Sequence, residues 1–263
     1  VACGTFFAFS DYMKPAARLA ALMELPVKYI WTHDSFRVGE DGPTHQPVEQ
    51  EAQLRLLEKM KNLAGHRSFL ALRPADSAET VVAWKMALEN TTTPTALILS
   101  RQNITDLPAG DTKARFASAS TMTKGAYIVV DCEGKPDLVL VANGSEVSTL
   151  VEVYKNFPNK NLKIRVVSAP SEGLFREQSA EYQESVLPFG VPTFGLTAGV
   201  PDSLMGLVGN LGTSVGMRRF GASAPYKTLD EKFGFSLQSV IPQVEKYLEE
   251  FRAMVKRIAA IKV

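Results

Sequence analysis

Apolar runs and helical patterns alternate along most of the chain. Short apolar segments bounded by polar, Gly or Pro residues predict buried strands at Val27–Thr32, Ser68–Leu72 and Thr95–Leu99. Between them, Pro47 opens one helical stretch, and the capping-box pattern Asp76-Ser77-Ala78-Glu79 opens a helix that runs to about residue 89. This alternation predicts a mostly parallel sheet covered by helices.

The pattern is interrupted once and then resumes. Gln102–Lys124 is rich in Thr, Ser, Ala, Gly and Asp and has no apolar period, which predicts a linker. Beyond it, the apolar runs Ala126–Val130 and Leu138–Ala142 flank a Gly- and Pro-containing turn and predict a hairpin. Further elements are expected as a helix from Gly144-Ser145 to about Phe157, strands at Lys163–Ser168 and Thr193–Leu196, and a final amphipathic helix at Pro242–Ile258.

The predicted fold class is therefore α/β, with two domains that each contain a mostly parallel sheet flanked by helices. We expect residues 1–123, with the linker, to form the first domain and residues 124–263 the second. At 263 residues, with 45% hydrophobic and 22% charged residues, the chain is long and apolar enough to bury a sizeable core.

Charge and cysteine content narrow the classes of function. Lys and Arg number 29 against 28 Asp and Glu, so no overall field attracts nucleic acid, and no apolar run approaches the roughly 18 to 20 residues of a membrane span. Two cysteines, Cys3 and Cys132, cannot form the disulfide framework of a small secreted protein, which favours a location in the reducing cytoplasm. The opening VACGTFFAFSDYM has neither an initiator Met nor a basic segment, which argues against a signal peptide and indicates a processed chain or a piece of a longer one.

Candidate ligand-binding groups follow the first predicted strand. His33-Asp34-Ser35 and the loop Gly39–Pro47 lie where open α/β sheets bind ligands. The loop holds two Gly, two Pro, two carboxylates and His45, and it can present polar groups to an anionic or sugar-like ligand. The alternative is a well-capped turn with a surface His. The His residues at 33, 45 and 66 lack the spacing of a zinc site.

Three further features could bind ligands or could be structural. Phe6, Phe9 and Tyr12 are spaced to share a helical face and could stack on a heterocycle or pack in the core, with Pro15 kinking or restarting that helix. Arg101 follows a predicted strand and suits a phosphate or carboxylate, or a surface ion pair. The turn 143–146 could bind an anion or simply use Ser145 as an N-cap; no dinucleotide-binding or P-loop motif is present.

Several segments together resemble one enzyme family. They are THDS at Thr32–Ser35, GEDGPTHQPVEQ at Gly39–Gln50, RPAD at Arg73–Asp76, AWK at Ala83–Lys85, LILSRQN at Leu97–Asn103, GSEV at Gly144–Val147, FGASAP at Phe220–Pro225 and FGF at Phe233–Phe235. In this order they are similar to transketolase, the thiamine-diphosphate-dependent enzyme of ketose phosphate interconversion. The HQPVEQ and LILSRQN segments favour it over the sibling 1-deoxyxylulose-phosphate synthases.

The resemblance implies a chain that begins inside the second of the family's three domains. On this reading the residues preceding the linker belong to the pyrimidine-binding domain, and the remainder is the C-terminal domain. The family's metal motif and catalytic Glu would then lie upstream of Val1, and each active site would be shared by two subunits of a homodimer. The stretch Arg55–Arg67, longer than in many family members, is expected on the surface.

The resemblance also assigns roles to residues. Phe6, Phe9 and Tyr12 would surround the aminopyrimidine of thiamine diphosphate, whose Mg²⁺ or Ca²⁺ would be bound by the missing first domain. His33 and Arg101 would hold the sugar phosphate, Asp41 would bind a donor hydroxyl, and His45 would lie beside the reacting carbons. The implied reaction passes a two-carbon unit from xylulose 5-phosphate to ribose 5-phosphate or erythrose 4-phosphate, in the pentose phosphate pathway. Alternatives are dihydroxyacetone synthase, deoxyxylulose-phosphate synthase or a non-catalytic dimerisation module.

Overall fold

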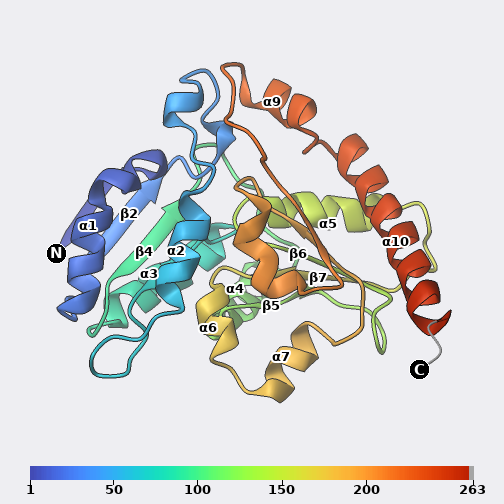
Figure 1. The fold of residues 1–263 in the computed structure, drawn as a ribbon, viewed down its shortest axis with the longest axis horizontal. Helices are drawn as coiled ribbons and strands as arrows, with labels where there is room; N and C mark the ends of the chain where they lie inside the picture. The colour runs from blue at the N-terminus through green and yellow to red at the C-terminus, as the bar shows by residue number, and fades with distance from the viewer. Residues whose placement is uncertain (261–263) are drawn as a thin grey trace.

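Four parallel strands form the N-terminal sheet of the computed structural model, which describes residues 1–260 (Figure 1). In sheet order they are β1 (Ala2–Phe6), β2 (Lys28–Thr32), β4 (Thr95–Leu99) and β3 (Leu70–Leu72). The three predicted strands are confirmed as β2, β3 and β4, and β4 has the predicted bounds. Strand β1 was not predicted.

Helices α1 (Ser10–Leu22), α2 (Gln50–Glu58) and α3 (Ser77–Glu89) cover this sheet, with short 3-10 turns η1 (Phe7–Phe9), η2 (Phe36–Val38) and η3 (Pro43–His45) in the loops. Helix α1 continues through Pro15. The expectation that Phe6, Phe9 and Tyr12 share one helical face is wrong, because they fall on β1, η1 and α1 in turn. The predicted cap of α3 is confirmed: Asp76 accepts from the Glu79 amide at 2.8 Å.

The C-terminal sheet has five strands in the order β5-β7-β6-β8-β9, and only β5 is antiparallel to its neighbour. They are β5 (Tyr127–Val130), β7 (Ile164–Ser168), β6 (Leu138–Ala142), β8 (Thr193–Leu196) and β9 (Thr213–Val215). The predicted hairpin of β5 with β6 is wrong, since β7 lies between them. All five residues of β6 are buried, as in a central strand flanked by β7 and β8, and β5 is left at the edge.

The helices around this sheet are α5 (Glu146–Asn156), α6 (Glu172–Arg176), α7 (Ala180–Val186), η5 (Pro201–Leu204), α8 (Met205–Val208), α9 (Tyr226–Phe233) and α10 (Leu237–Ala260). The final helix thus begins five residues before the predicted Pro242. Helices α5 and α10 bury their apolar faces in one core with β6 and β8, and α10 runs along the outer side of the molecule (Figure 1).

The segment predicted as a featureless linker contains α4 (Thr112–Ala119) and η4 (Ser120–Lys124). The Asp111 side chain caps α4 by accepting from the Ala114 amide at 2.7 Å. Arg115 of this helix is buried, and its guanidinium donates to Asp76 and to the Tyr127 hydroxyl. These tertiary contacts stabilise a helix that the sequence pattern alone does not predict.

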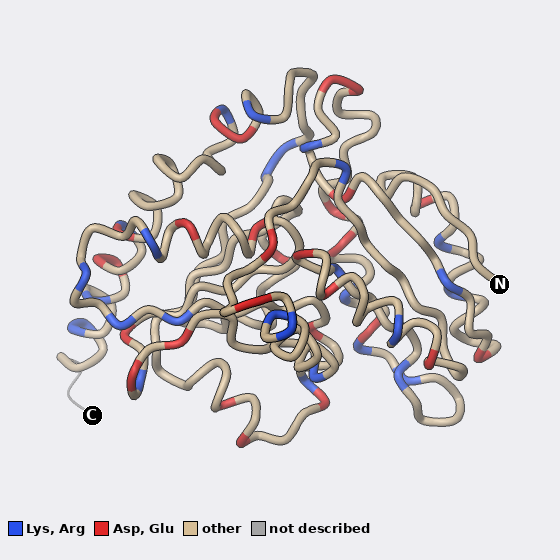
Figure 2. The backbone as a smooth tube through the Cα atoms, turned by 180° about the vertical axis from the view of Figure 1, so that it is seen from behind, with Lys and Arg blue, Asp and Glu red and all other residues tan. Residues whose placement is uncertain are grey.

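The Arg55–Arg67 stretch is only partly on the surface. Arg55 and Glu58 are buried and paired at 2.8 Å, and the exposed residues lie mainly beyond them, from Lys59 onward. Among residues 1–260, no helix combines the length and hydrophobicity needed to cross a bilayer. Acidic and basic residues are interspersed along the trace, and several meet in the centre of the molecule, between the two sheets (Figure 2).

Candidate active site

Three neighbouring parallel strands end at the same edge of the N-terminal sheet. Phe6 is the last residue of β1 and pairs with Thr32, which in turn pairs with Leu99 of β4. The residues at or just beyond these ends are Phe6, His33 and Arg101. The topology therefore brings together side chains that are far apart in sequence, at the position where α/β sheets bind ligands.

Two aromatic and two imidazole rings meet at this edge; we call Phe6, Phe9, His33 and His45 the aromatic–imidazole cluster. His33 stacks on Phe6, with ring centroids 3.7 Å apart and planes 18° apart. His45 approaches Phe9 edge-on at 5.2 Å and Phe6 at 6.1 Å. The two Phe rings are nearly parallel, with centroids 6.1 Å apart. Four of the seven predicted site residues thus form one contiguous group.

Tyr12 lies at the rim of this cluster. Its ring centroid is 6.2 Å from that of Phe9, one turn earlier in the chain. The side chain is 84% exposed, so its ring is not part of the core. Phe9 itself is half-buried. Tyr12, and the exposed part of Phe9, are thus accessible to a ligand or to another subunit.

The charged residues predicted for the site also lie near His33. Burial is the main cause that lowers the pKa of His33, and the positive charge of Arg101 adds to it, whereas Asp41 and Asp34 oppose it. Arg101 and Asp41 are exposed. His33 is therefore neutral at pH 7, and the Thr32 hydroxyl lies 3.0 Å from its Nδ1. A His33 that accepts from Thr32 at Nδ1 keeps a proton on Nε2 for donation.

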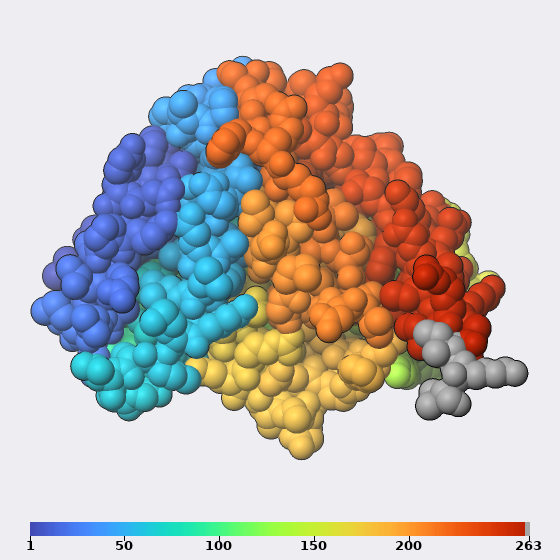
Figure 3. Space-filling model, viewed as in Figure 1, coloured from blue at the N-terminus to red at the C-terminus, as the bar shows by residue number. Residues whose placement is uncertain are grey.

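The loop that carries His33, Asp41 and His45 has unusual backbone conformations. We call residues 33–46 the site loop. His33 has φ +64°, a left-handed value rare for residues other than Gly. Gly39 at φ +87° approaches the Ala224 carbonyl so closely that a Cβ there would lie 3.4 Å from its oxygen. The site loop thus packs directly on residues 221–226, which belong to the orange segment that borders it in Figure 3.

Sequence reasoning missed a buried ionic network beneath the site loop. Arg73 donates to Asp34 at 2.7 Å and to Glu146 at 2.6 Å, and Arg37 pairs with Glu146 and, at 2.8 Å, with Asp230. These residues stand within or beside the motifs quoted above, but nothing in their spacing indicates mutual contact. The expected Ser145 cap is wrong: its hydroxyl accepts from Arg37 and donates to Glu146 instead.

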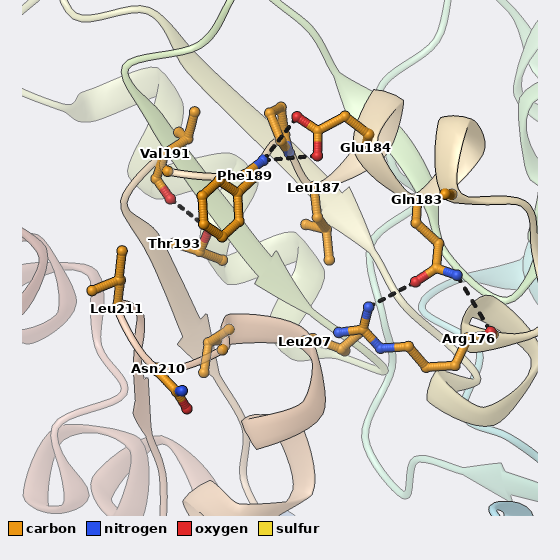
Figure 4. Close-up of a pocket in the computed structure, with 15 residues that line it drawn as sticks. Arg176, Gln183, Glu184, Leu187, Phe189, Val191, Thr193, Leu207, Asn210 and Leu211 are labelled. Carbon is orange, nitrogen blue, oxygen red and sulfur yellow. Dashed lines mark hydrogen bonds between the residues drawn. The ribbon is translucent and has the colours of Figure 1, made fainter.

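A sizeable cavity lies elsewhere, between α7, α8 and β8 (Figure 4). It encloses about 630 Å³, and none of the predicted site residues lines it. Its charged side chains are already paired: Arg176 donates to Gln183 at 2.8 Å, and Glu184 accepts from the Phe189 amide at 3.0 Å. Size alone therefore does not make this cavity the candidate site.

The residues present do not fit a metal ion. Within residues 1–260, no three His, Cys, Asp or Glu side chains converge in an arrangement that could bind one. The buried carboxylates beneath the site loop, Asp34 and Glu146, are paired with Arg73.

Comparison with known proteins assigns the chain to a family. Residues 1–106 match the transketolase pyrimidine-binding domain, and residues 125–236 match the transketolase-like C-terminal domain. The chain belongs to the transketolase family. Transketolases of Halalkalibacterium halodurans and Bacillus subtilis are 47% and 45% identical over 93% and 94% of this chain. The chain spans about a third, 35%, of the length of each.

Solved structures give the same family. A transketolase of Leishmania mexicana is 41% identical with a TM-score of 0.81, over 95% of this chain and 34% of its own. A Pichia stipitis transketolase complexed with sedoheptulose 7-phosphate is 36% identical with a TM-score of 0.82, over 96% of this chain and 34% of its own. A split-gene transketolase, described as an inactive tetramer, shares the fold with a TM-score of 0.69 at 22% identity.

Proposed function

We propose that this chain is part of a transketolase that transfers a two-carbon ketol unit from a ketose phosphate to an aldose phosphate. The observation that carries the proposal is the aromatic–imidazole cluster beside Arg101 and Asp41, at the carboxyl edge of a sheet in a chain of this family. Xylulose 5-phosphate is the proposed donor, and ribose 5-phosphate or erythrose 4-phosphate the acceptor. The Pichia structure with sedoheptulose 7-phosphate supports the substrate class.

Phe9 and Tyr12 are proposed, with Phe6, to hold the aminopyrimidine ring of thiamine diphosphate. Their aromatic side chains suit a flat heterocycle, and the accessible faces of Phe9 and Tyr12 support this fit. When bound, thiamine diphosphate supplies a nucleophilic carbon and an electron sink for breaking the carbon–carbon bond of the ketose. The aromatic rings would orient the cofactor and exclude water from one side of it.

His33 and Arg101 are proposed to bind the sugar phosphate. A guanidinium can grip a phosphate with two parallel hydrogen bonds, and a neutral His33 can add one donor from Nε2. The pKa of His33 is lowered beside Arg101, which supports a site in which Arg101 provides the positive charge and His33 a neutral hydrogen-bond donor. A phosphate fixed at one end of the sugar orients the reacting end and lowers the entropy lost in the transition state.

Asp41 and His45 are proposed to act on the sugar itself. The exposed Asp41 carboxylate can accept from a donor hydroxyl and select its stereochemistry. His45 Nδ1 lies 2.9 Å from the Thr44 hydroxyl, and its ring faces the cluster. His45 is therefore suited to hydrogen-bond or to move a proton at the substrate oxygens as their charge changes.

The remaining parts of the proposal concern assembly. Residues 1–123 are taken as a partial pyrimidine-binding domain with its linker and residues 124–263 as the C-terminal domain. Mg²⁺ or Ca²⁺ would be bound by a separate diphosphate-binding domain. Leu19, Leu22 and Met23 expose half or more of their side chains on or just after α1, which supports a subunit contact in a cytoplasmic homodimer.

The test is reconstitution of this chain with a transketolase diphosphate-binding domain, thiamine diphosphate and Mg²⁺. Supplied with xylulose 5-phosphate and ribose 5-phosphate, the assembly is expected to form sedoheptulose 7-phosphate. Formation of deoxyxylulose phosphate from pyruvate, or transfer to formaldehyde in preference to ribose 5-phosphate, would instead support the two sibling enzymes. A correctly assembled dimer without any transfer activity would support a non-catalytic dimerisation module.

A further inference from the structure

The site loop is held by the C-terminal domain at several points. The Gln46 side-chain amide donates to the Ala222 carbonyl at 2.9 Å, and the Ser223 hydroxyl donates to the Glu40 carbonyl. Phe36 has no exposed surface and packs against Phe235 at 4.8 Å between ring centroids. A loop of the pyrimidine-binding domain is thus fixed from outside that domain.

Glu146, at the start of α5, is a fully buried contact between the two domains. Its side chain has no exposed surface, and its two oxygens pair with different residues, Oε1 with Arg37 and Oε2 with Arg73. Burial acts to raise the pKa of Glu146, but Arg73 and Arg37 outweigh it and hold the pKa below its usual range. Glu146 is therefore an anion that fixes two guanidinium groups of the other domain.

Arg73 links Glu146 to Asp34, the residue of the site loop that directly follows His33. Its Nε and Nη2 donate to one oxygen of Asp34 at 3.0 and 2.7 Å, and both side chains are almost completely buried. Asp34 directly follows His33, whose φ of +64° is unfavourable without surrounding contacts to maintain it. The imidazole is held on its other side by Phe6. Asp34 and Phe6 together set the position of His33.

We propose that Glu146 of the C-terminal domain is a positioning residue for His33, acting through Arg73 and Asp34. This inference rests on the proposed function, in which His33 binds the phosphate of the sugar. It gives the C-terminal domain a role in phosphate recognition although none of its residues belongs to the aromatic–imidazole cluster. The expected consequence is a defect restricted to phosphorylated substrates.

The test is Glu146→Gln in the reconstituted holoenzyme with thiamine diphosphate and Mg²⁺. Donor kcat/KM is measured with xylulose 5-phosphate and with xylulose, at fixed ribose 5-phosphate, because in a ping-pong reaction this constant reports the donor half alone. A misplacement of about 1 Å can cost on the order of a hundredfold in rate, so we expect a loss of about tenfold to a hundredfold with xylulose 5-phosphate. The loss with xylulose should stay below about threefold.

Glu58→Gln is the matched control. Glu58 is equally buried and also joins the domains, pairing with Arg55 at 2.8 Å and accepting from the Ser171 hydroxyl at 2.6 Å. It makes no contact with Asp34 or Arg73 among those described. We expect Glu58→Gln to lower stability without changing the ratio of the two donor constants. An equal change of that ratio in both variants would overturn the inference.

A double-mutant cycle with His33→Ala completes the test. In the His33→Ala background, Glu146→Gln should no longer discriminate against xylulose 5-phosphate, because the residue through which it acts is gone. An undiminished effect would refute the proposed route. If Glu146→Gln does not fold, Asp34→Asn interrupts the same route and takes its place. Wild-type enzyme without ketol transfer would refute the proposed function, whereas active wild type with uniform losses would refute only the positioning role.

Discussion

At the carboxyl edge of the N-terminal sheet, Phe6, His33 and Arg101 keep part or most of their surface exposed. At the same edge of the C-terminal sheet, the polar side chains are buried against the other domain. Asn143, after β6, donates to Glu51 at 2.6 Å, and Ser171, after β7, donates to Glu58 at 2.6 Å. Two mostly parallel sheets thus use the same edge differently.

The comparison shows that topology selects a place for polar groups but not their use. Buried polar groups need hydrogen-bond partners, and at the C-terminal edge the other domain provides them. At the N-terminal edge, β1, β2 and β4 end in side chains with accessible surface. Strand β3 is the exception, because Arg73, just beyond its end, is directed into the domain interface. One edge is therefore available to a ligand and the other to protein.

The largest expected effect is on the free energy of unfolding. It should appear when one residue is substituted at the buried edge of the C-terminal sheet, but not when one is substituted at the exposed edge of the N-terminal sheet. Glu146→Ala leaves Arg37 and Arg73 buried without their common anion, and breaking such a buried pair costs about 3–5 kcal/mol. Arg101→Ala, at an exposed position, should leave the free energy of unfolding unchanged. Denaturant unfolding of both variants measures the difference. Equal losses would mean that the two edges are not functionally distinct.

The same Arg101→Ala variant should have its effect on kinetics instead. A charge-assisted hydrogen bond to phosphate is worth about 1.5–3 kcal/mol, so the KM for xylulose 5-phosphate should rise roughly tenfold to a few hundredfold. Steady-state kinetics of the reconstituted enzyme gives this value. Unchanged KM with phosphorylated substrates would remove Arg101 from the site.

Elements of the fold could be predicted from the sequence where they depend on neighbouring residues, but not where they depend on contacts between residues far apart in the chain. Strands β4 and β8 match their predictions residue for residue, because a short apolar run between polar boundaries is a local signal. The β5–β6 hairpin failed because the strand between them, β7, comes later in the chain. The α4 helix was missed because it depends on the burial of Arg115 by distant residues.

The candidate site, too, could be predicted only where local sequence patterns reveal it. Strand ends predict that His33 and Arg101 approach each other, and the resemblance to a family assigns their roles. The Glu146–Arg73–Asp34 route could not be predicted, because charged residues are usually solvated and no local pattern indicates burial. Asp34 and Arg73 belong to the first domain and Glu146 to the second, so the complete route forms only when both domains are folded and docked.

A smaller effect is expected for Asp41→Ala, which alters a hydroxyl contact rather than phosphate binding. The ratio of kcat/KM values for donors epimeric at that hydroxyl should fall by up to about tenfold, the worth of one hydrogen bond. Asp41 is exposed, so the melting temperature should not change. Competition between xylulose 5-phosphate and its epimer measures the ratio, and unaltered selectivity would argue against this role.

The smallest effect concerns the protonation of His33. Burial and the charge of Arg101 both lower the pKa of His33, so Arg101→Ala should raise that pKa toward its ordinary value. A His with a depressed folded pKa makes the unfolded state bind more protons, so stability is lost as pH falls from 6.5 through the folded pKa. The pH range over which this stability is lost should become narrower in Arg101→Ala, because the folded pKa of His33 moves toward 6.5. NMR titration of His33 reads the pKa directly, and an unchanged value would mean that Arg101 does not act on His33 at the exposed edge.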